Sequence, residues 1–264
     1  MTIFRRGFKS KVEHLEKTVM NREIFSQRIV ESTSENSLEI GPLNRPLVDT
    51  SQAMYFDLLP TQLLRQRVKE QGMDPNSVPE IHFHDEQGDL RTINRKFGSV
   101  VSAHCLEHQP DLITHLNSVS ELLEGKESFY WLILPDKRYC FDALLPESKL
   151  SEVVESFEMK MKTPSVWKVI EHRALTTHNE PNRHWKGDHG TPNFDLSNRW
   201  ARAIAEFNDS NGEYIDVHCW QFTPESFVKI IDGLFNLGYI DFQVEEIFDT
   251  PVNDLEFCAI LRKS

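Results

Sequence analysis

The chain has 264 residues, of which 39% are apolar and 27% charged, and its formal net charge is −12. That length can bury one full α/β core but is short for two independent domains of ordinary size. The acidic balance argues against a broad basic face for nucleic acid, and no run approaches the roughly 18 apolar residues of a membrane span. The start lacks the apolar stretch of a secretory signal, so we expect a cytoplasmic protein.

The first 28 residues form a basic segment, with seven Lys/Arg against three Glu. Apolar residues recur along it at helical spacing: Phe4, Phe8, Val12, Leu15 and Val19. The spacing predicts an amphipathic helix packed on its own domain or on a partner subunit, with a membrane-surface helix as the alternative. We therefore expect an N-terminal helical extension at 1–33 and a main domain at 34–264.

From residue 37 onward, short apolar runs alternate with longer amphipathic stretches. The runs expected to form strands are 38–40, 53–56, 81–83, 100–103 and 129–134. The amphipathic stretches at 61–71 and 111–123 are expected helices. Such alternation is typical of βαβ units around a parallel sheet, in which the strand ends meet at one edge and ligands bind there.

Between about residues 140 and 215 this alternation breaks down. The segment is polar and rich in His, Trp and Asn, as in THNEPNRHWKGDHGTPNFD, so we expect an inserted lid over the strand ends. Regular structure should resume with a helix that Thr223 caps, Pro224 begins, and Gly233 or Gly238 ends. Two last runs, 242–248 and 255–261, are expected to pair antiparallel and close the sheet.

The turn after the first expected strand, in SLEIGPLNRP, is expected to lead from a strand into a helix, and it contains a single glycine. A diphosphate needs several converging backbone N–H groups, and Pro42 supplies none. A ligand with adenosine but no phosphate, such as S-adenosylmethionine, needs fewer backbone N–H donors. Gly41 allows the backbone to approach such a ligand, and carboxylates can accept hydrogen bonds from its hydroxyls and its cationic amine.

Three acids lie where such a ligand needs them. Asp57 ends the second expected strand, sixteen residues after Gly41, and can accept both ribose hydroxyls. Asp85 ends the third and can accept from the adenine amine, while Glu39 can complement the amino-acid end or the sulfonium. Taken singly, an acid at a strand end is more often a turn or capping residue, so the prediction depends on their order along the chain.

Six segments carry a recognisable pattern. They are LEIGP (38–42), YFD (55–57), FHD (83–85), VVSAHCLEHQPDL (100–112), LILPDKRYCFD (132–142) and DVHCWQFTP (216–224). Together they resemble class I S-adenosylmethionine-dependent methyltransferases, and the last two are similar to a bacterial subgroup of that family. The resemblance covers about residues 30–262. One departure is that Pro42-Leu43-Asn44 follows Gly41 where the family commonly has a second glycine.

The resemblance implies a Rossmann-like α/β fold. In it a seven-stranded, mostly parallel sheet has an antiparallel final strand and carries helices on both faces. The implied cofactor is S-adenosyl-L-methionine. Its contacts would come from Glu39, Gly41, Asp57, Asp85, Ala103 and His104.

Methyl transfer from a sulfonium is an in-line displacement, and a hydroxyl acceptor must also lose its proton. Histidine supplies a base near neutral pH without a strongly shifted pKa. Among the eleven histidines, position selects three catalytic candidates: His108, His178 and His218. The structural alternatives are a capping role for His108 and a packed, hydrogen-bonded position for His218.

Four more residues are expected to contact the acceptor. Lys137 and Arg138 follow the strand expected at 129–134 and can hold an anionic group, although ion pairs with nearby acids are the alternative. His184 lies in the polar insertion, and Trp220 shares one side of an extended stretch with His218. No metal ligands are expected, because nothing resembles H-E-x-x-H or a His/Cys quartet.

These features predict an S-adenosylmethionine-dependent methyltransferase that acts on a polar small-molecule acceptor, with a sugar or glycosylated metabolite as the leading expectation. Three alternatives stay open: a Rossmann-type sugar- or nucleotide-modifying enzyme, a non-catalytic cofactor-binding protein, and a metal-dependent hydrolase that uses the histidine-rich segment. Neither a nucleic-acid partner nor a membrane span is expected, and homo-oligomerisation stays open.

Overall fold

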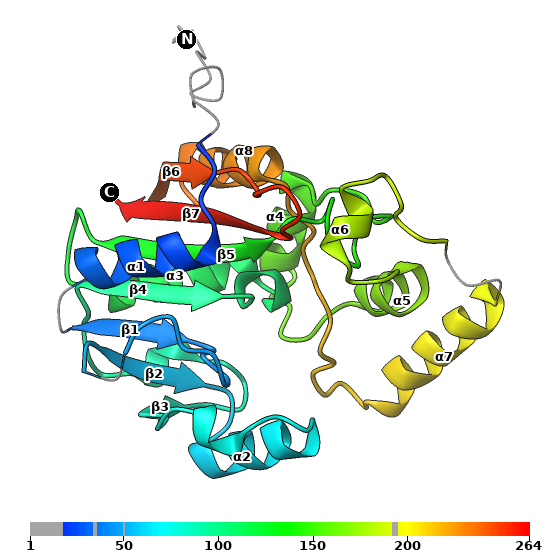
Figure 1. Cartoon of the computed structure of the whole chain (residues 1–264), viewed down its shortest axis with the longest axis horizontal. Coiled ribbons are helices and arrows are strands. Elements are labelled where there is room, and N and C mark those ends of the chain that lie inside the picture. Colours follow the sequence, from blue (N-terminus) through cyan, green and yellow to red (C-terminus); the bar gives the residue numbers. More distant parts are fainter. Residues whose placement is uncertain (1–17, 34–35, 50, 192–194) are drawn as a thin grey trace, which may run out of the picture.

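The computed structural model describes residues 18–33, 36–49, 51–191 and 195–264 (Figure 1). Most of the expected N-terminal amphipathic helix therefore lies outside the described residues. Of the apolar residues that predicted it, only Val19 is described, and Val19 forms an isolated parallel bridge to Asp249 and is not helical. A helix of the described chain, α1, spans Arg22–Ser32. None of the helices in these four stretches combines the length and apolarity needed to cross a membrane.

One sheet organises the described chain. Its strands are β1 (Ser37–Ile40), β2 (Ala53–Asp57), β3 (Phe83–His84), β4 (Ser99–Ala103), β5 (Phe129–Pro135), β6 (Phe242–Phe248) and β7 (Glu256–Lys263). They lie in the order β3-β2-β1-β4-β5-β7-β6, with β1 to β5 paired in parallel and β7 antiparallel to both neighbours. The expected Rossmann-like sheet with an antiparallel final strand is confirmed.

Both faces of the sheet are covered by helices, which explains why its central strands are apolar throughout. Helices α3 (Leu112–Leu122), α4 (Leu150–Glu158) and α8 (Pro224–Asn236) pack on one face, and α1 and α2 (Thr61–Glu70) on the other. Successive residues of a strand point to opposite faces. Val100 of β4 accordingly lies in the core under α3, and its neighbour Val101 lies in the core under α1.

Local capping signals place α8 as expected. Thr223 accepts a hydrogen bond from the backbone N–H of Ser226, and Pro224 occupies the first turn, where its missing N–H costs nothing. The helix ends at Asn236, and Gly238 follows with φ of +78°. Of the two glycines offered for the helix end, Gly238 is the one in the left-handed conformation that helix ends favour.

The first crossover differs from expectation. The turn after β1 was expected to lead into a helix, but none of its described residues, 41–49 and 51–52, is helical. Pro42 and Pro46 explain this, since each lacks a backbone N–H and restricts the residue before it. The described part of the β1–β2 connection is therefore a loop.

The expected loss of regular structure between 140 and 215 is also wrong. The segment holds α4, α5 (Val166–Leu175), α6 (Pro181–His184) and α7 (Leu196–Asp209). Helix α4 joins the main core through Val153, whereas α5 and α7 share a small core of their own that includes Val169 and Ala203. Figure 1 shows α5, α6 and α7 beyond the carboxyl ends of β4 and β5, where the lid was expected.

Candidate functional site

The residues expected to bind the cofactor meet at one edge of the sheet. Ile40 pairs with Phe56 and with Ser102, so Gly41 follows β1 directly between the ends of β2 and β4. Asp57 pairs with His84, which places Asp85 next to it, and the backbone N–H of Asp85 donates to the Asp57 carbonyl at 3.3 Å. Carboxyl ends of neighbouring parallel strands form the usual ligand-binding edge of such sheets.

Gly41 is needed for its backbone conformation. Its φ is +69°, and its N–H donates to the Phe56 carbonyl at 2.9 Å. A Cβ at this position would lie 3.8 Å from the Cβ and Sγ of Cys105, an ordinary contact, so the left-handed φ and not crowding favours glycine. The same contact places the start of the loop after β4 beside the end of β1.

Glu39 is buried and holds the crossover loop. Its carboxylate accepts hydrogen bonds from the backbone N–H groups of Leu47, at 2.8 Å, and Val48, at 3.1 Å. Burial raises its pKa to about 7, against the lowering effect of these two hydrogen bonds. A direct cofactor contact from Glu39 stays a prediction, because the structure turns both oxygens toward the loop.

Asp57 and Asp85 keep acceptor capacity at the edge. Asp57 accepts from the backbone N–H of Leu58 at 2.7 Å, and its burial raises its pKa against the lowering effect of backbone hydrogen bonds from Leu58, Leu59 and Leu43. Asp85 accepts from the backbone N–H groups of Gln87 and Asp89, at 2.9 and 3.0 Å. An ionised carboxylate has about four lone-pair sites, so each residue can take further hydrogen bonds from a ligand.

The chain after β4 carries a dense group of imidazoles and carboxylates. His104 has φ of +49°, and its Nε2 lies 2.6 Å from Glu256, which also pairs with Arg22. Its Nδ1 lies 3.4 Å from Glu107. Burial alone would lower the pKa of His104, but the two carboxylates raise it to about 9. The expected cofactor residue His104 thus has carboxylate partners on both sides.

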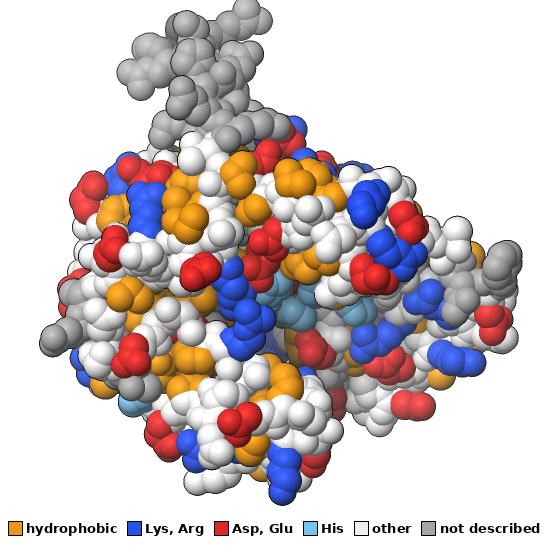
Figure 2. All heavy atoms as spheres, in the orientation of Figure 1, with side chains coloured by type: hydrophobic (Ala, Val, Ile, Leu, Met, Phe, Trp, Pro, Cys, Tyr) orange, Lys and Arg blue, Asp and Glu red, His pale blue; other side chains and the backbone are white. Residues whose placement is uncertain are grey.

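Two of the three expected catalytic histidines meet at Glu107, and we call Glu107, His108 and His218 the β4-edge group. Glu107 and His108 belong to the short helix η4 (Leu106–His108), and His218 comes from the segment before α8. The two imidazole rings lie edge to face, 4.7 Å between centroids. Figure 2 shows histidine side chains in a hollow of this face, beyond the ends of β4 and β5.

Each of these imidazoles faces a second carboxylate through Nδ1. His218 Nδ1 lies 2.6 Å from Asp142, which is fully buried, and His108 Nδ1 lies 3.0 Å from the more exposed Asp216. Sequence reasoning missed Glu107, Asp142 and Asp216. All three stand inside the family-like segments, but nothing in the chain order shows that 107, 142 and 216–218 meet in space.

The third expected catalytic residue, His178, lies in a different group, the lid group of His178, His184 and His189. His178 Nε2–H donates to the Asp188 carbonyl and its Nδ1 accepts from the Glu180 N–H. His184, 2% exposed, donates from Nε2 to the His178 carbonyl and lies 3.0 Å from His189, Nδ1 to Nδ1. The loop thus brings together imidazoles that no single helix face could align.

The remaining expected substrate residues have protein partners. Lys137 Nζ donates to the Ala143 carbonyl at 3.0 Å, and Arg138 forms a forked pair with Asp136. Trp220 is buried, and its indole N–H donates to the Gln109 carbonyl at 2.6 Å. Acceptor contacts from these residues stay predictions.

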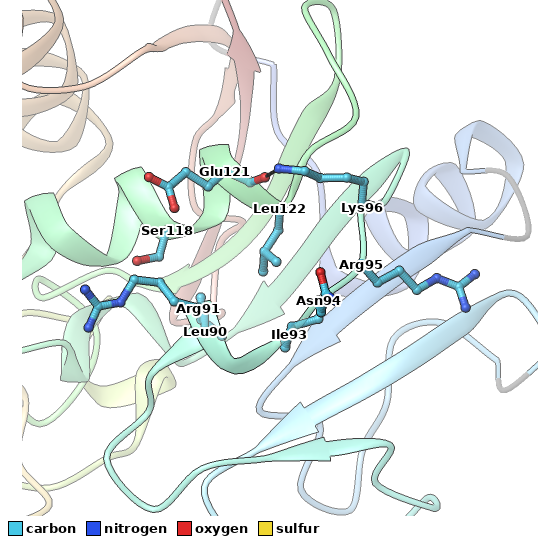
Figure 3. A pocket seen from close by; sticks show the side chains of 9 residues that line it. All are labelled: Leu90, Arg91, Ile93, Asn94, Arg95, Lys96, Ser118, Glu121 and Leu122. Atoms are coloured by element: carbon cyan, nitrogen blue, oxygen red, sulfur yellow. Dashed lines mark hydrogen bonds between the residues drawn. The ribbon is translucent and has the colours of Figure 1, made fainter.

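A separate hollow of about 430 Å³ lies between η3 (Leu90–Thr92), the segment before β4, and the end of α3 (Figure 3). Three cationic side chains and one acid line it, and the ammonium of Lys96 donates to the Glu121 carbonyl. This hollow sits at the amino end of β4, opposite the carboxyl edge where the sheet topology directs ligands.

No protein-family model matches the chain, and no curated protein matches its sequence. Solved structures with a similar fold include a methyltransferase from Clostridium acetobutylicum, described as S-adenosylmethionine-dependent, with 11% identity, TM-score 0.45 and 93% of each chain covered. A candidate Zn-dependent alcohol dehydrogenase from Rhodobacter sphaeroides has 13% identity and TM-score 0.47, with 94% of this chain and 92% of that chain covered.

The mitomycin 7-O-methyltransferase MmcR is a third similar structure, with 10% identity and TM-score 0.42. The match covers 91% of this chain and 53% of MmcR, so the chain spans about half the length of that protein. At these scores and identities, the similarities assign neither a family nor an activity to the chain.

Proposed function

We propose that this protein is an S-adenosylmethionine-dependent methyltransferase that acts on a hydroxyl of a polar small-molecule acceptor, such as a sugar or a glycosylated metabolite. The observation that carries the proposal is the carboxyl edge of β1, β2 and β3, where Asp57 ends β2, and Gly41 and Asp85 lie at or just past the ends of the two neighbouring strands. The cofactor offers complementary groups in the same order: a sulfonium arm, a ribose diol and an adenine amine.

The first crossover favours this cofactor over a dinucleotide. A diphosphate is normally held by a glycine-rich turn that opens a helix, whose N–H groups point at the phosphates. Here Gly41 is followed by Pro42 and by a loop whose N–H groups at Leu47 and Val48 are already bound to Glu39. A dinucleotide would find few free donors, whereas an adenosine needs mainly acceptors.

The lid supports a polar ring as acceptor. Trp167 on α5 is 71% exposed and Trp200 on α7 is 44% exposed, so both offer flat surfaces on which a sugar ring can stack. His108 and His218 lie beside the end of β4, and we assign them to the activation of the acceptor hydroxyl. For His178, whose two ring nitrogens have backbone partners, we propose support of the lid loop.

Calorimetry with S-adenosylmethionine and with NAD(P) tests the cofactor. The wild-type chain should bind S-adenosylmethionine, and Asp57→Ala should weaken binding about 10- to 100-fold, because hydrogen bonds to a charged group contribute about 1.5–3 kcal/mol. The matched control is Asp74→Ala, because Asp74 caps the short helix η2 (Pro75–Ser77) and is not among the expected cofactor contacts. Tighter binding of NAD(P), or an Asp57→Ala variant that binds like wild type, would contradict the proposal.

A screen for release of S-adenosylhomocysteine tests the acceptor. A panel of glycosides and nucleotide sugars should support turnover, and folded proteins and RNA should not. Turnover that occurs only with protein or RNA would rule out the acceptor class while leaving the cofactor intact.

A further inference from the structure

Three electron-pair donors point toward a common centre in the β4-edge group. One Glu107 oxygen lies 3.9 Å from His108 Nε2 and 4.0 Å from His218 Nε2. Taking one ligand atom from each residue, all three atoms lie within 4.8 Å of one another. Zinc–ligand bonds of about 2.0–2.2 Å at tetrahedral angles place the ligand atoms roughly 3.4 Å apart, so one ion can bind all three after side-chain shifts of about 1 Å.

Glu107 is a buried carboxylate whose side-chain contacts are with imidazoles, including His104 Nδ1 at 3.4 Å, and none of these contacts is a hydrogen bond. Its side chain is fully buried, and neither oxygen accepts a hydrogen bond from the described residues. Burying an ionised group without compensation is costly, and buried charges are therefore paired or bound to metal ions.

The outer contacts are those of metal-binding histidines. A histidine that binds a metal through one ring nitrogen usually gives the other to a carboxylate or a carbonyl, which fixes its orientation. His218 does this with Asp142 at 2.6 Å, and His108 faces Asp216 at 3.0 Å. Both arrangements leave Nε2 as the nitrogen that is directed at Glu107.

We propose that Glu107, His108 and His218 bind one divalent transition-metal ion. Two imidazoles and one carboxylate suit zinc, manganese, iron or cobalt better than magnesium or calcium, which prefer oxygen ligands. Three protein ligands leave at least one position for water or substrate, as in catalytic sites. The histidine-rich segment, which one alternative from the sequence treated as metal-binding, is not part of this site.

The role of the ion rests on the proposed function. An acceptor hydroxyl bound in the open position would have a lowered pKa and would lose its proton to water. Its oxygen would then form a bond to the methyl carbon while the sulfonium S–CH₃ bond breaks, which leaves methylated acceptor and S-adenosylhomocysteine. The ion thus replaces a free imidazole as the means of activating the hydroxyl.

Metal titration of the full chain tests the site. The purified protein is stripped with a chelator and titrated with Zn²⁺ by calorimetry, and with Co²⁺ by visible absorption. One ion per chain should bind. Glu107→Gln and His108→Ala should each weaken binding at least about 100-fold, and Asp216→Asn about 10- to 100-fold. The partly exposed His108 serves as the second variant if Glu107→Gln fails to fold.

The matched control is His189→Ala in the lid group, which should change Zn²⁺ affinity less than about threefold, because a distant site contributes independently. The proposed site would be refuted if the wild-type chain bound no ion. It would also be refuted if Glu107→Gln retained the ion and His189→Ala lost it. S-adenosylmethionine binding to the stripped protein is measured separately. Cofactor binding without metal binding would refute only this inference, and metal binding without cofactor binding would refute the proposed function and leave the site standing.

Discussion

The two histidine groups of this protein use the same side chain in opposite ways. In the lid group the ring nitrogens of His178 and His184 each have a partner, a backbone group or the neighbouring imidazole. In the β4-edge group the Nε2 atoms of His108 and His218 point at a carboxylate that accepts no hydrogen bond from the described residues. Satisfied nitrogens stabilise a loop, whereas unsatisfied ones remain available for a ligand.

The largest effect is expected from the removal of His218, which tests whether the β4-edge group takes part in the reaction. His218→Ala should lower turnover about 10²- to 10⁴-fold, because it removes a group that activates the acceptor. The dissociation constant for S-adenosylmethionine should change little, since His218 is not among the expected cofactor contacts. Turnover is measured as release of S-adenosylhomocysteine on an acceptor found in the screen, and unchanged turnover would show that this group is structural.

The converse experiment removes the centre of the lid group. His184→Ala should lower the free energy of unfolding by about 2–3 kcal/mol, because it opens a cavity and leaves the His178 carbonyl and His189 Nδ1 without their partner. Urea unfolding measures this loss. Turnover at a temperature where the variant is folded should fall less than about tenfold, and a larger fall without destabilisation would place chemistry in the lid.

Two buried carboxylates differ in the same way, because Glu39 accepts hydrogen bonds and Glu107 accepts none from the described residues. The effect expected for Glu39 is the smallest of the three. The pKa of Glu39 is raised to about 7, so between its unfolded value of 4.5 and pH 7 the folded chain holds a proton that the unfolded chain releases. The stability that Glu39 contributes is therefore present below about pH 4.5 and is lost as the pH rises toward 7.

Glu39→Gln cannot titrate and gives the test. The free energy of unfolding of wild type minus that of the variant should decrease by about 2 kcal/mol between pH 5 and 7. Urea unfolding of both chains at the two pH values measures it. A difference that stays constant or grows with pH would mean that Glu39 is ionised in the folded chain throughout this range.

Much of the fold was predictable because it is encoded locally. Apolar runs of the right length gave β1, β2, β4 and β5, and a cap with a following proline placed α8. Glycine and acids at strand ends predicted which residues share the carboxyl edge, since parallel strands bring their ends together. These features depend on neighbouring residues and need no knowledge of the rest of the chain.

Other features were not predicted from the sequence, and the reason can be given for each. The β1–β2 crossover was expected to begin a helix, although Pro42 and Pro46 stand within it. The lid helices α5 and α7 were missed because their apolar residues bury a small separate core amid polar sequence. His178 looked as available as His218, because the partners of its nitrogens come from Glu180 and Asp188, whose backbone positions only the folded loop fixes.

Local sequence patterns were enough to predict where most strands lie along the chain, how α8 is capped, and that Gly41, Asp57 and Asp85 lie at strand ends. Periodicity and turn chemistry act over a few residues, so these features need no distant contacts. Only the tertiary structure decided that Glu107 and His218, distant in the chain, share one buried centre. This arrangement depends on how β4, the segment before α8 and the lid pack together. In the packed structure, hydrogen bonds to the ring nitrogens distinguish the histidines that support the lid loop from those that we propose to bind a ligand.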